Sequence, residues 1–211
     1  VGIPFFLEMA DHIAEENTNV NFIIPIAPTT NKNEYLFFQS NKNPIASNYS
    51  SKIKKIKNIK NSMFDYVIET SQKTKIYLIK KNPCYEILKE CDLAITTVGA
   101  NTSELGSIAL PMIIILPTQH LDVMNAWDGF FGIIGRIKFI NKLLTFIIKY
   151  WHLKTKKYFG WPNIKAKKFV VPERIGNISP KQIAKEALFL IKNKEILKTL
   201  KENLLNQRGK K

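Results

Sequence analysis

The sequence predicts an α/β fold, a Rossmann-like doubly wound parallel sheet in which helices alternate with strands. Two apolar runs lead to this prediction. Leu93 to Thr97 and Met112 to Leu116 are short and rich in β-branched or aliphatic residues, as is typical of strands buried on both faces of a parallel sheet. Residues 101–110 between them suit a helix, and Pro111 ends it because proline disfavours helical backbone in the residue before it. The segment is therefore predicted to be a β-α-β unit.

The flanking sequence continues the alternation. The stretch "IPFFLEMADHIAEEN" places apolar residues at positions 5, 6, 9, 10 and 13, which is the spacing of an amphipathic helix. Further strands are predicted at 21–27 and 75–79, and further helices at 63–71 and 84–90. Because a Rossmann-like half normally begins with a strand before such a first helix, we expect this chain to be the C-terminal part of something longer or a truncated gene product.

Three segments depart from this rhythm within what is predicted to be a single domain over 1–211. Residues 29–62 are polar and lysine-rich and are predicted to form a long surface loop. Two C-terminal helices are expected over 180–207, the first of them capped by Ser179 with Pro180 at its first position. An ordinary connecting loop is predicted between Gly160 and Ser179, before these two helices.

The third segment, 129–158, is predicted to be a basic amphipathic helical insertion. Its aliphatic residues recur at spacings of four and three, with lysines on another face. From Gly129 to Pro172 the chain has ten Lys or Arg and no Asp or Glu. Such a helix suits the interface of an anionic membrane. A helix packed on the domain with a solvated lysine face, or at a partner chain, explains the pattern equally well.

Composition points to an anionic partner. The 211 residues carry a formal net charge of +15, with 45% hydrophobic residues. Such a charge suits nucleic acid, an acidic membrane surface or phosphorylated ligands, but no aromatic and basic RNA-binding motif is present. The two cysteines, Cys84 and Cys91, have no metal-binding spacing and are expected to be reduced thiols of a cytoplasmic protein.

The passage from the predicted strand 93–97 into the helix carries a cluster of small and polar residues. Ligands of open α/β sheets bind at the carboxyl ends of strands, and a helix N-terminus suits a phosphate. Glu104 fits an acceptor for sugar hydroxyls, as acidic residues do for ribose in dinucleotide folds. The alternative is a capping box, with Asn101 or Thr102 as the cap and Glu104 bonding back to the chain. The candidate ligand-binding residues here are Gly99, Asn101, Thr102, Ser103 and Glu104.

Two segments resemble lipid-A-disaccharide synthases. "TVGANTSELGSIALPMIIILPTQ" resembles that family's donor-nucleotide segment, and "WPNIKAKKFVVPE" its Leu-Pro-Asn-x-x-Ala segment followed by a glutamate, with Trp161 in place of the leucine. The matching residues of the first segment are Gly99, Thr102, Glu104, Pro111 and Met112. Those of the second are Pro162, Asn163, Ala166 and Glu173.

The resemblance implies the C-terminal, nucleotide-binding half of a GT-B glycosyltransferase. Such an enzyme transfers an acylated glucosamine from UDP to an acylated glucosamine 1-phosphate in lipid A biosynthesis, at the cytoplasmic face of the membrane. It implies no metal and no other cofactor, and a catalytic base in the N-terminal half. We also expect Gln119 and Asn163 to line the cleft of Gly99, with Asn163 bonding sugar or phosphate oxygens; alternatively, Asn163 only stabilises a turn.

Two other functions remain open at this point. A nucleotide-sugar 2-epimerase shares the GT-B fold and needs carboxylates and a histidine in the cleft, for which His120, Asp122 and Asp128 are the candidates beside Glu104. The other is a non-catalytic basic module that binds an anionic membrane or nucleic acid, which the net charge supports.

Overall fold

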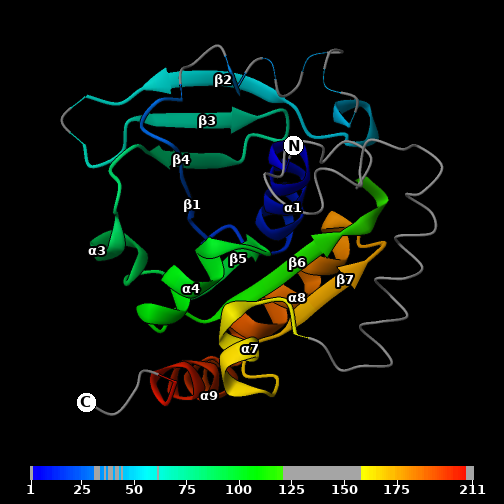
Figure 1. The fold of residues 1–211 in the computed structure, drawn as a ribbon. Coiled ribbons are helices and arrows are strands. Elements are labelled where there is room, and N and C mark those ends of the chain that lie inside the picture. Colours follow the sequence, from blue (N-terminus) through cyan, green and yellow to red (C-terminus); the bar gives the residue numbers. More distant parts are fainter. Residues whose placement is uncertain are drawn as a thin grey trace. The chain divides into compact units, whose positions relative to one another are not determined.

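The computed structural model describes residues 2–30, 45–60, 62–120 and 158–207, together with Glu34, Tyr35, Phe37, Ser40 and Asn43. By its internal contacts the chain divides into two compact units. The first comprises Val1–Cys84 and Ser179–Leu188, and the second comprises Tyr85–Ile178 and Phe189–Lys211. Figure 1 shows the α/β character of both, with helices beside each sheet. The α/β class predicted from the sequence is confirmed.

The first unit contains a four-stranded sheet of mixed direction. Its strands follow the order β1-β4-β3-β2, in which β1 and β4 are parallel and the other two pairs are antiparallel. Helix α1 contributes Leu7 and Ala10 to a core that also contains Ile68, Ile76 and Leu78 of the sheet. The elements are α1 (Ile3–Glu16), β1 (Phe22–Pro25), the 3-10 helix η1 (Ala46–Asn48), β2 (Ile53–Asn58), β3 (Tyr66–Thr70) and β4 (Lys75–Ile79).

Two predictions for this unit are wrong. The helix predicted at 63–71 is strand β3, because its aromatic and β-branched residues pair in register with β4, Ile68 opposite Ile76. Strand β2 lies inside the predicted loop 29–62. It is an edge strand whose Ile53 is buried while Lys54, Lys55 and Lys57 are exposed, and lysines at an edge discourage pairing with other chains.

The second unit contains a parallel three-stranded sheet in the order β5-β6-β7. Figure 1 shows β6 between its two neighbours, and every residue from Met112 to Leu116 is buried. This burial on both faces accounts for the unbroken apolar run that the sequence shows. The elements are α3 (Tyr85–Leu88), β5 (Ala94–Thr97), α4 (Ala100–Ser107), β6 (Met112–Pro117), the 3-10 helix η2 (Thr118–His120), α7 (Trp161–Ala166), β7 (Glu173–Gly176) and α9 (Lys194–Leu205).

The predicted β-α-β unit is confirmed, although its helix is shorter than expected. Helix α4 ends at Ser107 rather than at residue 110. Ala109 adopts a positive φ of 54°, and the amide of Leu110 donates to the carbonyl of Leu105, so the chain leaves the helix before Pro111 is reached. Leu105 and Leu110 then pack in the core with Met112 and Ile114.

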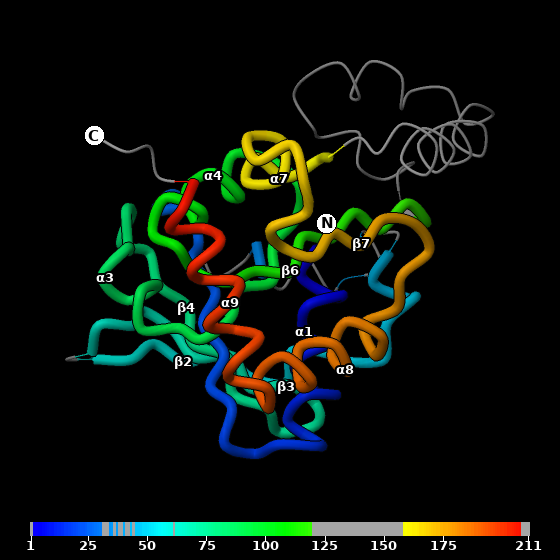
Figure 2. The backbone as a smooth tube through the Cα atoms, turned by 90° about the horizontal axis from the view of Figure 1, so that it is seen from below, coloured from blue at the N-terminus to red at the C-terminus, as the bar shows by residue number. Residues whose placement is uncertain are grey.

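The predicted loop between Gly160 and Ser179 also needs correction, because it contains α7 and β7. Both elements are short. Their contacts are tertiary: β7 pairs with β6, and α7 lies beside α4 in the views of Figures 1 and 2. Each element is too short to show the apolar periodicity from which a helix or a strand is predicted in a sequence.

The two C-terminal helices are confirmed as α8 (Pro180–Lys192) and α9. Ser179 and Gln182 form a capping box, in which the Gln182 amide donates to Ser179 Oγ over 3.2 Å and the Ser179 amide donates to Gln182 Oε1 over 2.9 Å. Ile183, Ala187 and Leu188 form the buried side of α8.

The basic amphipathic segment predicted at 129–158 lies outside the described residues, apart from Tyr158. Among the helices that the structure does describe, none combines the length and the apolar character needed to cross a membrane.

Candidate functional site at the start of helix α4

The predicted turn between β5 and α4 is built on Gly99. Gly99 is the N-cap of α4, with φ 142° and ψ −166°, a backbone conformation that only glycine adopts readily. The residue is exposed, and a Cβ placed on it would meet no atom within 4 Å. The requirement for glycine is therefore one of backbone conformation, and the space in front of the turn is open.

Three of the predicted site residues are exposed on α4. Asn101, Ser103 and Glu104 all face solvent within the first turn and a half of the helix. Asn101 and Glu104 are three residues apart and so lie on one side of the helix. The turn follows the carboxyl end of a parallel strand, where open α/β sheets bind ligands. Polar side chains and the helix N-terminus thus occur together at this edge.

The alternative of a capping box is wrong for α4. The helix begins at Ala100, its N-cap is Gly99, and no side chain caps it. Glycine has no side chain with which to form the box, and Asn101 and Thr102 lie inside the helix instead of at its cap. The carboxylate of Glu104 is therefore not explained by closure of the helix terminus.

Thr102 has a different environment from its neighbours. It is fully buried. Its hydroxyl donates to the carbonyl of Gly99 over 2.9 Å and accepts from the backbone amide of Trp161 over 3.0 Å. Thr102 thus joins the first turn of α4 to the first residue of α7. Because the hydroxyl is buried and bonded within the protein, the structure does not favour its bonding a ligand, and that role stays a prediction.

Asn163 is also fully buried, on the inner side of α7. Its Nδ2 donates to the carbonyl of Val171 over 2.9 Å and to Glu173 Oε1 over 2.7 Å. Its Oδ1 accepts from the amides of Val170 and Val171 over 2.7 and 3.0 Å. An asparagine side chain has two donors and two acceptor positions, and all are used within the protein. These bonds favour the alternative in which Asn163 only supports the local chain, here between α7 and β7, over its bonding of a sugar or phosphate.

Glu173 completes this buried network. The carboxylate is 6% exposed and accepts from the amides of Phe159 and Gly160 over 3.0 and 2.9 Å. A Cβ on Gly160 would collide with Cδ1 of Ile114 and lie 3.2 Å from Glu173 Oε1, so a larger residue here would require the buried Ile114 side chain to shift. Sequence reasoning assigned no role to Gly160; its position directly before Trp-Pro was the available signal.

Gln119 lies just past the carboxyl end of β6, as predicted, within η2. Its side-chain amide joins that end to the end of β7: Nε2 donates to the carbonyl of Ile178 over 2.6 Å, and Oε1 accepts from the Ile178 amide over 3.3 Å. Gly99 follows the neighbouring parallel strand, so both residues belong to the same edge of the sheet. A role for Gln119 in ligand binding stays a prediction.

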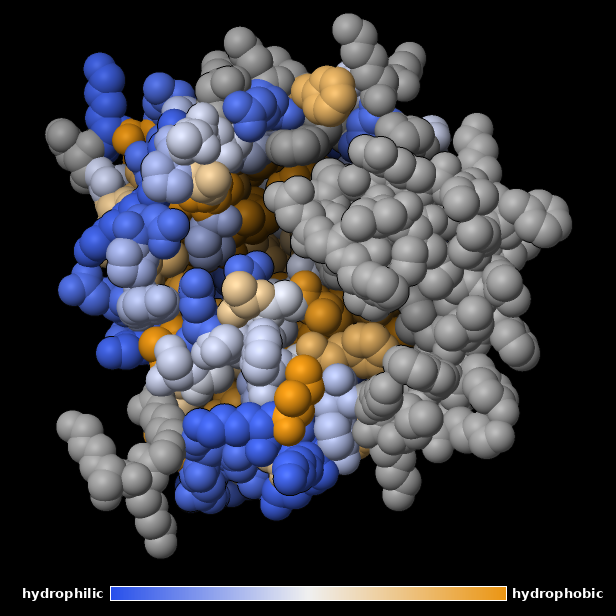
Figure 3. All heavy atoms as spheres, in the orientation of Figure 1, coloured by the Kyte–Doolittle hydropathy of each residue, from blue (hydrophilic) through white to orange (hydrophobic). Residues whose placement is uncertain are grey.

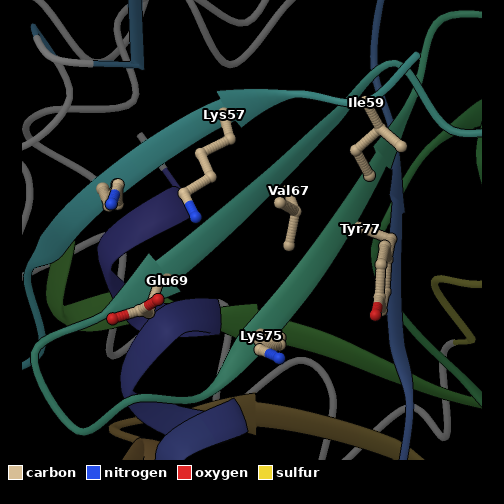
Figure 4. Close-up of a pocket in the computed structure, with 7 residues that line it drawn as sticks. Lys57, Ile59, Val67, Glu69, Lys75 and Tyr77 are labelled. Carbon is tan, nitrogen blue, oxygen red and sulfur yellow. The ribbon is translucent and has the colours of Figure 1, made fainter.

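A depression on the mixed sheet of the first unit contains none of these residues. Figure 4 shows its floor at Val67, with lysines and Tyr77 around it. The register places Glu69 between Lys55 and Lys75, and opposite charges in that arrangement stabilise neighbouring strands. The lining residues are Lys55, Lys57, Ile59, Val67, Glu69, Lys75 and Tyr77. We therefore interpret this depression as part of the ordinary surface of the mixed sheet and not as a ligand-binding site.

Within the described ranges, no group of His, Cys, Asp and Glu side chains is arranged to hold a metal ion. Asp122 and Asp128, which the epimerase alternative needs, lie outside those ranges, as does the side chain of His120.

The chain is similar to one curated protein in particular, the lipid-A-disaccharide synthase of Sulfurihydrogenibium sp. (strain YO3AOP1). The two are 30% identical over 125 residues, which is 59% of this chain and 26% of that protein. The chain thus spans about a quarter of its relative. No protein-family model matches the sequence. No solved structure matches it either. The similarity is therefore to part of a lipid-A-disaccharide synthase.

Proposed function

We propose that this chain is the nucleotide-sugar-binding part of a glycosyltransferase of the lipid-A-disaccharide synthase type. The similarity to such a synthase over 125 residues supports the class. The whole enzyme would transfer an acylated glucosamine from UDP to an acylated glucosamine 1-phosphate, with release of UDP.

The observation that carries this proposal is the exposed polar face at the start of α4. Gly99 opens the turn, and Asn101, Ser103 and Glu104 are exposed directly after it. Unpaired amides at a helix N-terminus attract a diphosphate. A carboxylate beside a diphosphate would repel it, so Glu104 is better suited to the ribose hydroxyls, which can donate hydrogen bonds to it.

The contribution of this part to transfer would be stabilisation of the leaving UDP. Negative charge grows on the diphosphate as the glycosidic bond breaks, and fixed dipoles aimed at that charge lower the barrier. The proposal includes no metal and no other cofactor, and it assigns the catalytic base to a further domain or chain. The proposed place of work is the cytoplasmic face of a membrane, because both sugars carry acyl chains.

Titration of the chain with UDP tests this function. Binding should be measurable by calorimetry and should raise the melting temperature, because a ligand that binds only the native state stabilises it. Glu104→Ala should weaken UDP binding by about 1.5–3 kcal/mol, the range for a hydrogen bond to a charged group. Melting without UDP should not change.

The matched control is Glu202→Ala, which removes another exposed helical carboxylate, from α9 in the same unit. It should bind UDP as the wild type does. Failure of the wild-type chain to bind UDP would contradict the proposed function and favour the non-catalytic basic module. Equal effects of the two substitutions would contradict only the place of Glu104 in the site.

A further inference from the structure

Helix α7 has two faces of opposite character. Pro162 and Asn163 are buried and Ala166 is half-buried, and these form the inner face. Trp161 and Ile164, on the other face, are 54% and 40% exposed. They are three residues apart and therefore neighbours on the helix surface. The outer face thus presents two large apolar side chains to solvent.

The chain after α7 extends this apolar surface. Phe169 is 54% exposed and packs edge-on against the ring of Tyr158, with 4.9 Å between the ring centres. The hydroxyl of Tyr158 donates to the carbonyl of Lys167 over 2.9 Å, which fixes the two rings beside the end of the helix. We name the surface formed by Tyr158, Trp161, Ile164, Lys165, Lys167, Lys168 and Phe169 the α7 patch.

The charge of the α7 patch has one sign. Residues 158–172 contain three lysines and no acidic residue. All three lysines are exposed. Lys165 donates through Nζ to the carbonyl of Gln207, which leaves its charge uncompensated. In Figure 3, hydrophobic residues reach the surface beside strongly hydrophilic ones in the region where Figure 1 draws α7 and α9.

We propose that the α7 patch docks on the surface of an anionic bilayer. Tryptophan and tyrosine are enriched at the level of lipid headgroups because each has an apolar body and a polar tip. Lysines beside them bring their charge to anionic lipid, and each contributes to binding near the surface. The patch combines both features in a short stretch of chain, as interfacial segments do.

The composition of the patch favours a bilayer over nucleic acid. Single-stranded nucleic acid stacks its bases on aromatic rings, whereas Ile164, on the same face as Trp161, has no ring to offer. Transfer of this aliphatic side chain from water to acyl chains is favourable, whereas it adds nothing to base stacking. The inference rests on the proposed work at a membrane but not on the binding of UDP, so the two can fail separately.

Co-sedimentation of the whole chain with phosphatidylcholine vesicles that contain phosphatidylglycerol tests the proposal. Phe169→Ser should lower the partition coefficient by roughly tenfold, because a large apolar side chain no longer enters the interface. The matched control is Phe189→Ser, since Phe189 is the same residue with 55% exposure at another place. It should bind vesicles as the wild type does. Equal partition of the two variants would overturn the proposal.

The basic part of the patch is tested with a second pair of variants. Lys167→Gln with Lys168→Gln should weaken binding to anionic vesicles and reduce its dependence on salt. Lys54→Gln with Lys55→Gln removes the same charge from the exposed edge of β2 and should have a smaller effect. If the β2 pair weakens binding as much as the α7 pair, net charge rather than this patch is responsible, and the proposal fails.

Fluorescence gives a readout that a purely structural role would not change. Trp127→Phe with Trp151→Phe leaves Trp161 as the single tryptophan of the chain. Its emission should shift to the blue when anionic vesicles are added, and brominated lipids should quench it. Unchanged emission under conditions in which the chain sediments with vesicles would overturn the proposal, as would binding of single-stranded RNA without any binding of vesicles.

Discussion

The turn at the start of α4 and the segment from α7 to β7 carry the two motifs of this sequence, and their amide and carboxylate side chains have opposite environments. At α4, Asn101, Ser103 and Glu104 are exposed. In the other segment, Asn163 and Glu173 are 0% and 6% exposed, and they bond each other and the surrounding backbone. The same residue types therefore face solvent in one motif and support the fold in the other.

A sequence motif can exist because its residues bind a ligand or because they support the fold, and this difference in environment separates the two cases. A buried polar group costs stability unless it is hydrogen-bonded, and once all its donors and acceptors are occupied it has none left for a ligand. All donors and acceptors of the buried Asn163 side chain are occupied, whereas the Asn101 side chain is exposed. Burial and saturation thus leave only the first motif with free amide and carboxylate side chains for the proposed ligand, and the bond between Trp161 and Thr102 joins the two motifs.

The largest expected effect is that of Asn163→Ala. It removes four hydrogen bonds and leaves the amides of Val170 and Val171 without their acceptor. The free energy of unfolding should fall by about 3–5 kcal/mol, measured by urea denaturation. Asn101→Ala is the control, and its effect should stay within about 0.5 kcal/mol, as for other surface positions. Similar losses for both variants would contradict the comparison.

A smaller loss is expected at the joint between the two motifs. Thr102→Val keeps the shape of the side chain but leaves the Trp161 amide without its acceptor, and should lower the free energy of unfolding by about 1–3 kcal/mol. Thr102→Ser retains the hydroxyl and should lose less. If serine and valine were equally destabilising, packing of the methyl group, and not the hydrogen bond, would hold α7 at this place.

Gly99→Ala should cost about 1–2 kcal/mol of stability through backbone strain at φ 142°. Steric overlap contributes nothing, since no atom lies within 4 Å of the added Cβ. Thermal unfolding would measure the loss. A crystal structure of the variant should show a changed φ at this position; an unchanged stability with an unchanged φ would be inconsistent with a need for glycine.

The smallest effect on stability is expected for Glu104→Ala. Because the side chain is exposed and takes no part in capping α4, the free energy of unfolding should change by no more than about 0.5 kcal/mol. Urea denaturation of this variant would reveal any hidden structural role. A loss as large as that of Thr102→Val would place Glu104 among the residues that support the fold instead of among those free to bind a ligand.

The parts of the fold that local sequence dictates were predictable. The apolar run from Met112 to Leu116 predicts a strand buried on both faces, and β6 is that strand. Ser179 followed by Pro180 predicts the start of a helix, and α8 begins there. Residues 66–70 form strand β3 and not the predicted helix because they pair with β4, and a local sequence pattern does not record a partner strand. Helix α7 and strand β7 are short and depend on contacts with α4 and β6.

The candidate site was predictable only in part, for the same reason. The need for glycine at Gly99 follows from its place between a strand and a helix. Whether an asparagine faces a ligand or the interior depends on distant residues. Asn163 is saturated by Val170, Val171 and Glu173, which are brought to it by the loop that follows α7, and this could not be read from the motif.

Hydrogen exchange with and without UDP tests the central claim most directly, because it reports on both motifs in one experiment. We expect UDP to slow exchange in peptides covering residues 98–107, where the ligand would meet the exposed start of α4. Peptides covering 158–173 should exchange slowly already and should not change, since their amides are bonded within the buried network. Slowed exchange confined to residues 158–173, or to strands β2–β4, would contradict the assignment of ligand binding to α4.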